Sequence, residues 1–358
     1  MDIALFLDGT WQDRDDFTNI VQLWERTPAA GTAGAPQETY YDPGVGTGHG
    51  LLERLLGGAF GYGLDRHIID AYRFIADHHH SDDDRIYLLG FSRGAFTARS
   101  LGGVIAKCGI IAPEILSAEA VFARYRRGGD APGLREMQAG EEPATTAQDR
   151  LLLERSRLVR IRFIGVLDTV GSLGIPGGLG HWLSRRRYAF HDTALSGLVD
   201  HACHAVAIDE HRAQFTPTLW SGVPIPVGDH VTHVEQRWFV GAHSSIGGGG
   251  TSRPSIDNPL SVLTREWIAG RAAQAGLVLR LPVVPVEGDE WRGPIRAPRT
   301  LGGLLRLLPG RKPRLRPVRT STGETIDGSV LRRWGTGAPP YRPGNPNLAA
   351  WVRELTGR

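Results

Sequence analysis

The feature of this 358-residue chain that most constrains its fold is an apolar stretch that runs directly into a Gly-x-Ser-x-Gly motif. Residues 85–89 have the apolar character of a buried strand, and Gly90, Ser92 and Gly94 follow at once. A segment of helix-forming and small residues continues over 95–99. A serine between a strand and a helix sits on a sharp turn, which is tolerated only when its neighbours have almost no side chain. The sequence therefore predicts a strand–turn–helix unit that exposes the Ser92 hydroxyl at one edge of a sheet.

Other apolar runs, separated by glycine-containing loops, predict further strands in the first two thirds of the chain. They lie at 3–7, 38–41, 158–167 and 236–240. A helical pattern with one apolar stripe occupies 63–77, ahead of the strand that carries the serine motif. Strand, helix and continuous apolar strand in succession are typical of a parallel βαβ unit. We therefore expect an α/β fold with a doubly wound, mostly parallel sheet and helices on both faces.

A serine nucleophile needs a base, and the base needs an acid that orients it. One predicted strand ends in Asp168, and another ends just before His243, which lies in a glycine-rich loop. Since parallel strands end at one edge of a sheet, both side chains are expected near Ser92. The order serine, acid, histidine is that of α/β-hydrolases. Asp209 stays open as the alternative acid, although Asp-Glu-x-Arg after a helix-like stretch is more typical of a salt-bridged helix end.

Backbone donors for a developing oxyanion are predicted at two places. The N–H of Arg93 lies at the start of the helix after the serine, where the helix dipole favours negative charge. The first strand ends in Asp8-Gly9-Thr10, a tight loop at the position that supplies the second donor in this fold. The N–H groups of Gly9 and Thr10 are therefore candidate donors. Asp8 is expected to brace the loop by accepting its N–H groups.

The end of the chain differs in composition from the rest. We expect a main domain over 1–280, with an insertion at about 126–150 that is a candidate lid, and a basic, Pro/Arg-rich extension over 281–358 that packs on it. Within the extension, 292–319 has nine basic residues, no acidic ones and several leucines. Such a stretch suits peripheral contact with an anionic membrane. Its prolines favour a loop packed on the main domain instead, and it has no aromatic residue on which a nucleic-acid base would stack.

The overall composition excludes several classes of protein. With 41% hydrophobic and 22% charged residues and a net charge of +3, the chain is neither disordered nor fibrous. Cys108 and Cys203 are too few for a disulfide framework and lack the companions of a zinc site, so no metal is expected. No stretch has the length of a membrane-spanning helix, and the amino terminus is not a signal peptide. We expect a soluble protein made in the cytoplasm, and export without a cleavable signal stays open.

Six motifs occur in an order that resembles a known family. They are LDGTW at 7–11, YYDPGVG at 40–46, GFSRGA at 90–95, LDTVG at 167–171, AIDExRxxFxP at 207–217 and GAHS at 241–244. In this order they resemble an α/β-hydrolase family, long known only as a domain of unknown function, that includes the phospholipase effectors of type VI secretion. The resemblance runs from about residue 4 to residue 249. In addition, IDGSVLRR at 326–333 is similar to the closing motif of the family.

The resemblance implies a Ser92–Asp168–His243 triad and a carboxylic ester substrate, with phospholipids as the substrates of the characterised effectors. We therefore expect a serine esterase or lipase that works through an acyl-enzyme and needs no cofactor. A small-ester esterase and a non-catalytic binding module are the alternatives. For an effector, an immunity protein or a secretion adaptor is a further expected partner. Family members often have Asp two residues after the histidine, where this chain has Ser245.

Overall fold

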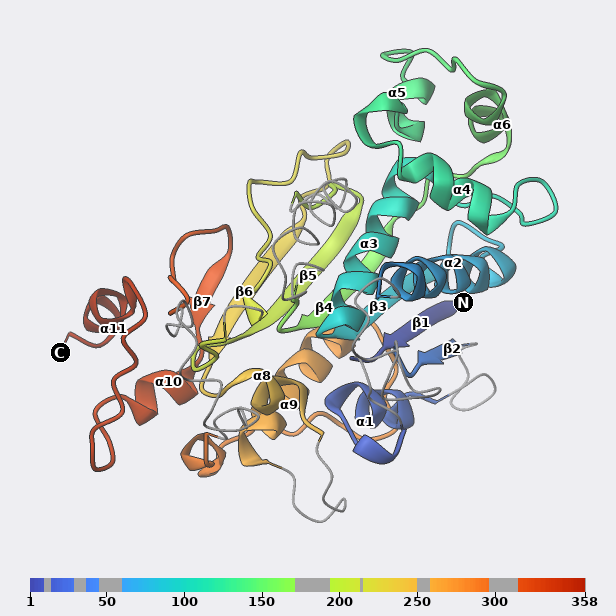
Figure 1. The fold of residues 1–358 in the computed structure, drawn as a ribbon. Coiled ribbons are helices and arrows are strands. Elements are labelled where there is room, and N and C mark those ends of the chain that lie inside the picture. The colour runs from blue at the N-terminus through green and yellow to red at the C-terminus, as the bar shows by residue number, and fades with distance from the viewer. Residues whose placement is uncertain are drawn as a thin grey trace.

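A single parallel sheet forms the centre of the protein (Figure 1). The computed structural model describes residues 1–9, 14–28, 37–44, 60–170, 194–212, 215–249, 258–295 and 315–357. Within them, seven strands pair in parallel in the order β2-β1-β3-β4-β5-β6-β7. The strands are β1 (Asp2–Leu7), β2 (Gln37–Asp42), β3 (Arg85–Phe91), β4 (Ile161–Leu167), β5 (Val199–Ala207), β6 (His233–Phe239) and β7 (Glu324–Ile326).

Helices cover both faces of this sheet, so the predicted doubly wound α/β-hydrolase fold is confirmed (Figure 1). One face carries α2 (Phe60–His78), α3 (Arg93–Cys108), α4 (Ala118–Tyr125), α5 (Leu134–Gln138) and α6 (Ala147–Arg155). The other carries α1 (Asn19–Arg26), α8 (His243–Gly247), α9 (Pro259–Gln274), α10 (Gly328–Arg333) and α11 (Leu348–Thr356). Single 3-10 turns lie at Arg14–Asp16, Gly128–Asp130 and Glu290–Arg292.

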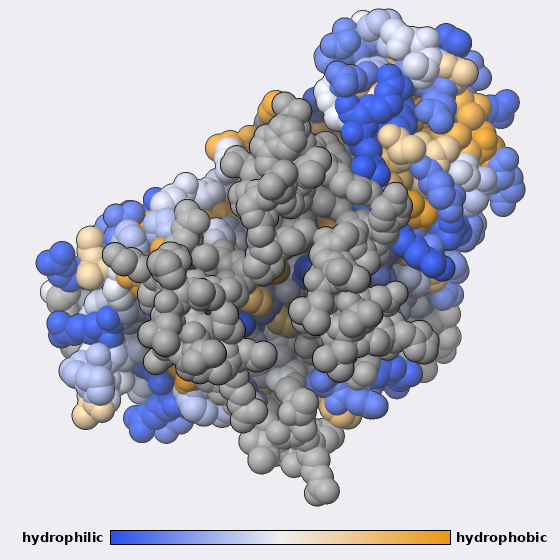
Figure 2. Space-filling model, viewed as in Figure 1, coloured by the Kyte–Doolittle hydropathy of each residue, from blue (hydrophilic) through white to orange (hydrophobic). Residues whose placement is uncertain are grey.

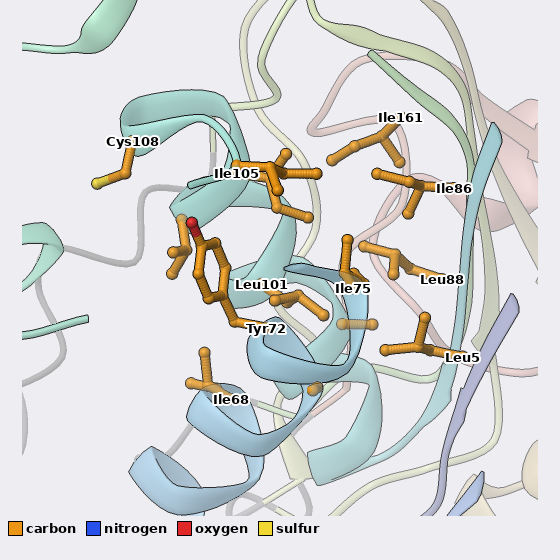
Figure 3. Close-up of a cluster of buried hydrophobic side chains, with 14 of the residues drawn as sticks. Leu5, Ile68, Tyr72, Ile75, Ile86, Leu88, Leu101, Ile105, Cys108 and Ile161 are labelled. Atoms are coloured by element: carbon orange, nitrogen blue, oxygen red, sulfur yellow. The ribbon is translucent and has the colours of Figure 1, made fainter. Parts of the chain in front are cut away.

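Alternation along the strands divides the core into two clusters, because successive side chains of a strand point to opposite faces. In β1, Ile3 and Leu5 join the first cluster, whereas Ala4 and Phe6 join the second. Figure 3 shows the first cluster, in which side chains of α2 and α3 meet those of β1, β3 and β4. A strand buried on both faces reads as a continuous apolar run, which is why the sequence located β1, β3 and β4.

The strand order reverses between β1 and β3. The chain passes from β1 to its neighbour β2 by way of α1, on one face, and then returns across β1 to β3 by way of α2, on the other. At such a point the connections leave the carboxyl edge in opposite directions and open a crevice between them. Asp8, which follows β1, and Ser92, which follows β3, both lie at this point.

The segment 126–150, expected as an insertion and candidate lid, lies at the other end of the sheet from Ser92. Helix α3 begins beside Ser92 and runs to Cys108, whose carbonyl oxygen accepts a hydrogen bond from Ser156 Oγ at 2.6 Å. Ser156 ends α6 and leads into the start of β4. Helices α4 to α6 therefore pack at the amino ends of the strands, and the interpretation as a lid is wrong (Figure 1).

Two strands were not located from the sequence. The stretch before Asp209 had helix-like spacing but forms strand β5, because neighbours β4 and β6 bury it on both sides. Strand β7 is only three residues long and is recognised by its pairing with β6. It lies in the extension 281–358, which also places Val330 and Trp351 in the second cluster. Where the main domain ends along the chain stays a prediction.

Where Figure 2 shows the described residues, most of the visible surface is hydrophilic and hydrophobic residues lie in small groups between them. Among the described helices, none combines the length and the apolar composition that a bilayer crossing requires. Most of the basic stretch 292–319 lies outside the described residues, so its contact with a membrane stays a prediction.

Candidate active site

The serine of the Gly-x-Ser-x-Gly motif lies on a strained turn between β3 and α3. Ser92 has φ 56° and ψ −116°, a conformation that is costly for a residue with a side chain. A Cβ atom at Gly94 would lie 2.0 Å from the carbonyl oxygen of Leu7, and one at Gly90 would lie 2.5 Å from that of Gly94. Glycine is therefore required at both positions. The Ser92 N–H donates to the carbonyl oxygen of Leu167 at 3.0 Å, which ties the turn to the end of β4.

Ser92, His243 and Asp168 form one continuous line of hydrogen bonds. His243 Nε2 lies 2.9 Å from Ser92 Oγ, and His243 Nδ1 lies 2.7 Å from Asp168 Oδ2. The three residues follow β3, β6 and β4, so the sheet brings together side chains that are 75 and 151 positions apart. Asp168 is fully buried, while Ser92 and His243 keep 8% and 7% of their surface exposed. The three residues singled out in the sequence therefore do meet, and Ser92 and His243 both keep a small exposed surface.

The carboxylate of Asp168 accepts hydrogen bonds from other donors in addition to His243. Its Oδ1 accepts from the Ala207 N–H at 3.0 Å and from Arg316 Nη1 at 2.6 Å, and its Oδ2 accepts from Arg316 Nη2 at 3.1 Å. Burial raises the pKa of Asp168, but the charge of Arg316 and the hydrogen bond from His243 outweigh it and hold the pKa well below its usual range. An ionised Asp168 only accepts hydrogen bonds. His243 Nδ1 therefore carries a proton, which leaves Nε2 to accept from Ser92.

The imidazole of His243 lies between two aromatic rings. The centroids of Phe91 and Phe215 are 4.8 Å and 4.7 Å from that of the imidazole, and Phe215 meets it edge-on. The backbone N–H of His243 donates to Glu210 Oε2 at 3.3 Å. Glu210 is fully buried and is paired with Arg212 at 2.7 Å, so the expected salt bridge of the Asp-Glu-x-Arg motif forms, but it follows strand β5 and not a helix. Packing and hydrogen bonds thus fix both the ring and the main chain of His243.

The alternative acid, Asp209, does not occupy the position beside the imidazole. Its Oδ2 accepts from the Gly241 N–H at 2.7 Å and from the Tyr341 hydroxyl at 3.0 Å. Burial raises the pKa of Asp209, and these two hydrogen bonds and the charge of Arg333 offset this only in part. Asp209 therefore holds the loop that leads to His243, and the carboxylate at Nδ1 is that of Asp168.

The loop after β1 is braced by Asp8. Its Oδ1 accepts from the Gly9 N–H at 2.7 Å, and its Oδ2 accepts from Thr18 Oγ1 at 2.5 Å and from the Tyr41 hydroxyl at 3.2 Å. Burial raises the pKa of Asp8 to about 7. The Gly9 N–H is thus directed at Asp8 in this conformation, and its role as an oxyanion donor stays a prediction. Thr10 lies outside the described residues.

The other predicted oxyanion donor is Arg93, which is the first residue of α3. The backbone N–H at this position of a helix points out of its amino end, where the dipole favours an anion. Among the described residues, no three His, Cys, Asp or Glu side chains are grouped so that they would hold a metal ion. Cys108 and Cys203 are both buried and free.

Comparison with known proteins identifies the family. A family described as "T6SS, Phospholipase effector Tle1-like, catalytic domain" matches residues 2–271. The chain belongs to this Tle1-like family. The resemblance carried by the six ordered motifs is thereby confirmed.

Two relatives of the Tle1-like domain are longer than this chain. This chain is 30% identical over 241 residues to "Uncharacterized protein YEL023C" of Saccharomyces cerevisiae (strain ATCC 204508 / S288c). The match covers 62% of this chain and 33% of the yeast protein. The "Structure of the Tle1 effector bound to the VgrG spike from the Type 6 secretion system" matches with 18% identity and a TM-score of 0.36, over 71% of this chain and 52% of the effector. The chain thus spans about a third of the yeast protein and about half of the effector.

Several residues of the site were not singled out from the sequence. Phe91, Glu210 and Phe215 lie inside motifs that the sequence did show, but nothing in a motif says which of its members touch the histidine. Arg316 lay within the basic stretch 292–319, which has eight other basic residues. Its contact with the carboxylate of Asp168 forms only when the chain folds, so the sequence offered no signal for it.

Proposed function

We propose that the chain is a serine hydrolase that cleaves the carboxylic esters of phospholipids, with Ser92 as nucleophile, His243 as base and Asp168 as the orienting acid. The observation that carries the proposal is the continuous hydrogen-bonded line from Ser92 Oγ through both ring nitrogens to Asp168. The strained turn that holds Ser92 supports it, since strain of this kind gathers at functional sites. No metal or cofactor takes part in the proposed reaction.

The reaction proceeds in two acyl-transfer steps. Ser92 Oγ attacks the ester carbonyl while His243 Nε2 takes its proton, and the carbonyl oxygen becomes an oxyanion near the Arg93 N–H. The tetrahedral intermediate collapses, the ester bond breaks, and His243 returns the proton to the departing alcohol. Water then attacks the acyl-enzyme with His243 again as base, which releases the fatty acid and restores Ser92. Asp168 stabilises the imidazolium in both steps.

The preference for phospholipids rests on the family, which is described as phospholipase effectors. Contact of 292–319 with a membrane belongs to the same proposal and rests on the basic residues and leucines of that stretch. An immunity protein or secretion adaptor as partner rests on the resemblance to effectors. A small soluble ester would react by the same chemistry. Substrate preference therefore has to be measured separately from reactivity of the serine.

Labelling with a fluorophosphonate probe tests the nucleophile. We expect the wild type to be labelled and Ser92→Ala and His243→Ala not to be. Ser100→Ala is the matched control, because Ser100 is a buried serine of α3, the helix that follows Ser92, and its hydroxyl donates to the Phe96 carbonyl oxygen at 2.8 Å. It should be labelled like the wild type. An unlabelled wild type would overturn the hydrolase proposal and favour a binding module.

A substrate panel then tests the substrate class. Release of fatty acid from phosphatidylcholine and phosphatidylglycerol vesicles is compared with hydrolysis of short-chain p-nitrophenyl esters. We expect vesicle hydrolysis that is lost in Ser92→Ala. Labelling together with hydrolysis of only the short esters would overturn the phospholipid assignment and leave a small-ester esterase.

A further inference from the structure

The carboxylate of Asp168, beside His243, accepts hydrogen bonds from Arg316, which lies outside the segment that matches the Tle1-like family. Both terminal nitrogens of Arg316 reach Asp168, Nη1 to Oδ1 at 2.6 Å and Nη2 to Oδ2 at 3.1 Å. Arg316 is 4% exposed and Asp168 is fully buried. The matched segment ends at residue 271, so this contact belongs to the extension. Two parallel hydrogen bonds of this kind fix the plane of a carboxylate as well as its position.

We propose that Arg316 is a positioning residue of the active site, which locks Asp168 and Phe215 in the places where they orient His243. The inference rests on the proposed function, since it assigns a role in the same catalytic site. Arg316 does not touch the serine or the imidazole, and it therefore acts through its two neighbours.

The end of β5 and the two loops that follow β4 and β5 meet at this guanidinium. Besides Asp168, which follows β4, it donates to the carbonyl oxygen of Ala207 at 2.7 Å and to that of Phe215. Ala207 ends β5, and Phe215 lies in the loop beyond it, with its ring edge-on to His243. One side chain therefore sets both the acid behind the imidazole and one of the two rings that pack against it.

The main chain that carries Arg316 is anchored to the sheet. Asn345 Nδ2 donates to the carbonyl oxygen of Arg316 at 2.9 Å and to that of Ile208, just beyond β5, at 3.1 Å. Val318, two residues further on, is fully buried in the second cluster. The guanidinium is thus delivered from a fixed point and does not swing on a free loop.

Charge at the site explains what removal of Arg316 would do. Burial alone would raise the pKa of Asp168, and the charge of Arg316 is the largest influence that lowers it. Among the described residues, the other charged or titratable groups around Asp168 and His243 are Glu210, paired with Arg212, and His204, beside Arg99. Without Arg316, Asp168 takes up a proton nearer to neutral pH. A protonated Asp168 no longer stabilises the imidazolium. As the pH is lowered, the variant therefore loses activity at a higher pH than the wild type does.

The test is the pH profile of ester hydrolysis by the full chain carrying Arg316→Gln or Arg316→Lys. For Arg316→Gln we expect kcat to fall about 10- to 100-fold with KM little changed, and the acidic limb of kcat/KM to move up by at least about one pH unit. Arg316→Lys keeps the charge but loses the planar fork. It should leave the limb in place and lower kcat less, by about 3- to 10-fold.

The matched control is Arg124→Gln, which removes the arginine of a buried Arg–Asp pair far from the serine. It should leave both kcat and the acidic limb as in the wild type. An acidic limb of kcat/KM that does not move in Arg316→Gln would overturn the inference. A wild-type kcat in Arg316→Lys would overturn it too. The lysine variant decides the case if the glutamine variant does not fold. If the wild type itself is not labelled by the fluorophosphonate, the proposed function has failed instead.

A readout without turnover completes the test. The proton shared by His243 Nδ1 and Asp168 Oδ2, 2.7 Å apart, is expected to give an NMR signal downfield of the amides. In Arg316→Gln this signal should shift or disappear, whereas in Arg124→Gln it should stay. An unchanged signal in Arg316→Gln would show that the arginine does not position the acid.

Discussion

Two buried arginine–aspartate pairs lie at opposite ends of the same sheet. Arg124 and Asp149, 2.8 Å apart and both fully buried, join α4 to α6 near the amino ends of the strands. Arg316 and Asp168, 2.6 Å apart, join the extension to the end of β4. The two pairs have the same chemistry and nearly the same burial, yet only the second has an imidazole on its carboxylate.

The remaining partners of each aspartate account for the difference. Asp149 accepts from the N–H of Thr146 and completes a capping box at the start of α6. Asp168 instead accepts a hydrogen bond from His243 Nδ1. A buried ion pair is weak evidence for stability in general, because desolvation offsets much of the attraction. Its use therefore depends on what else the carboxylate holds, which is a helix end in one case and the imidazole of His243 in the other.

The largest effect should come from removal of the charge that faces the histidine. Asp168→Asn should lower kcat/KM about 10⁴-fold, because an amide permits the wrong tautomer of His243 and leaves Arg316 without its partner. Asp149→Asn is the matched variant, and its kcat/KM per folded molecule should stay within about twofold of the wild type. Steady-state kinetics with a soluble ester measures both. Equal losses in the two variants would erase the distinction between the pairs.

Removal of the arginine from the other pair, Arg124→Gln, should change stability and not activity. Arg124→Gln leaves Asp149 buried without its cation and should lower the free energy of unfolding by about 3–5 kcal/mol, with kcat per labelled active site unchanged. Burial raises the pKa of Asp149, but its hydrogen bonds from Thr146 and Arg124 lower it to about 2. Urea unfolding at neutral pH measures the loss. A parallel fall in kcat would mean that the two ends of the sheet are coupled.

Asp8 sharpens the comparison, because it is a buried carboxylate whose described partners are hydroxyls and an amide rather than an arginine. Burial raises its pKa from 3.8 to about 7, so the folded state binds the proton more tightly than the unfolded chain does. The stability that this gives is complete below the unfolded pKa and is lost as pH rises towards 7. The loss amounts to at most about 4 kcal/mol.

The variant that tests this is Asp8→Asn, which keeps the shape of the side chain and does not ionise. We expect the free energy of unfolding of the wild type, measured relative to that of Asp8→Asn, to decline between about pH 4 and pH 7. Urea titrations at several pH values measure the slope, and Asp149→Asn provides the comparison with a carboxylate whose pKa is lowered. A wild-type slope in Asp8→Asn would show that another group causes the decline.

The sequence was informative where chemistry follows backbone pattern. The run from 85 to 94 predicted both β3 and the turn at Ser92, because burial on two faces and a steric limit leave direct marks on residue types. Asp168 and His243 were located by the same logic, since each follows a strand that ends at one edge. Asp209 could not be separated from Asp168 in this way, because both follow apolar runs upstream of the histidine.

What the sequence did not show depends on contacts between distant segments. Strand β5 has helix-like spacing and becomes a strand because β4 and β6 bury it on both sides. Arg316 is one of nine basic residues in 292–319, and only the folded chain shows that its guanidinium meets a carboxylate 148 positions away. The segment 126–150 was interpreted as a lid because a glycine-rich pattern says nothing of the end of the sheet at which it lies.

The smallest predicted effect concerns the ring beside the imidazole. Phe215→Leu keeps an apolar side chain but removes the edge-on contact with His243, whose centroid lies 4.7 Å away. Aromatic contacts of this kind contribute about 1 kcal/mol, so kcat should fall about fivefold if the contact restricts the ring. Phe122→Leu, next to Tyr125 and in the same helix as Arg124, is the matched control. It should lower stability and leave kcat unchanged, because Phe122 packs at the end of the sheet where the ion pair only supports the fold. If Phe215→Leu keeps wild-type kcat while Arg316→Gln loses it, the arginine acts on the histidine through Asp168 alone.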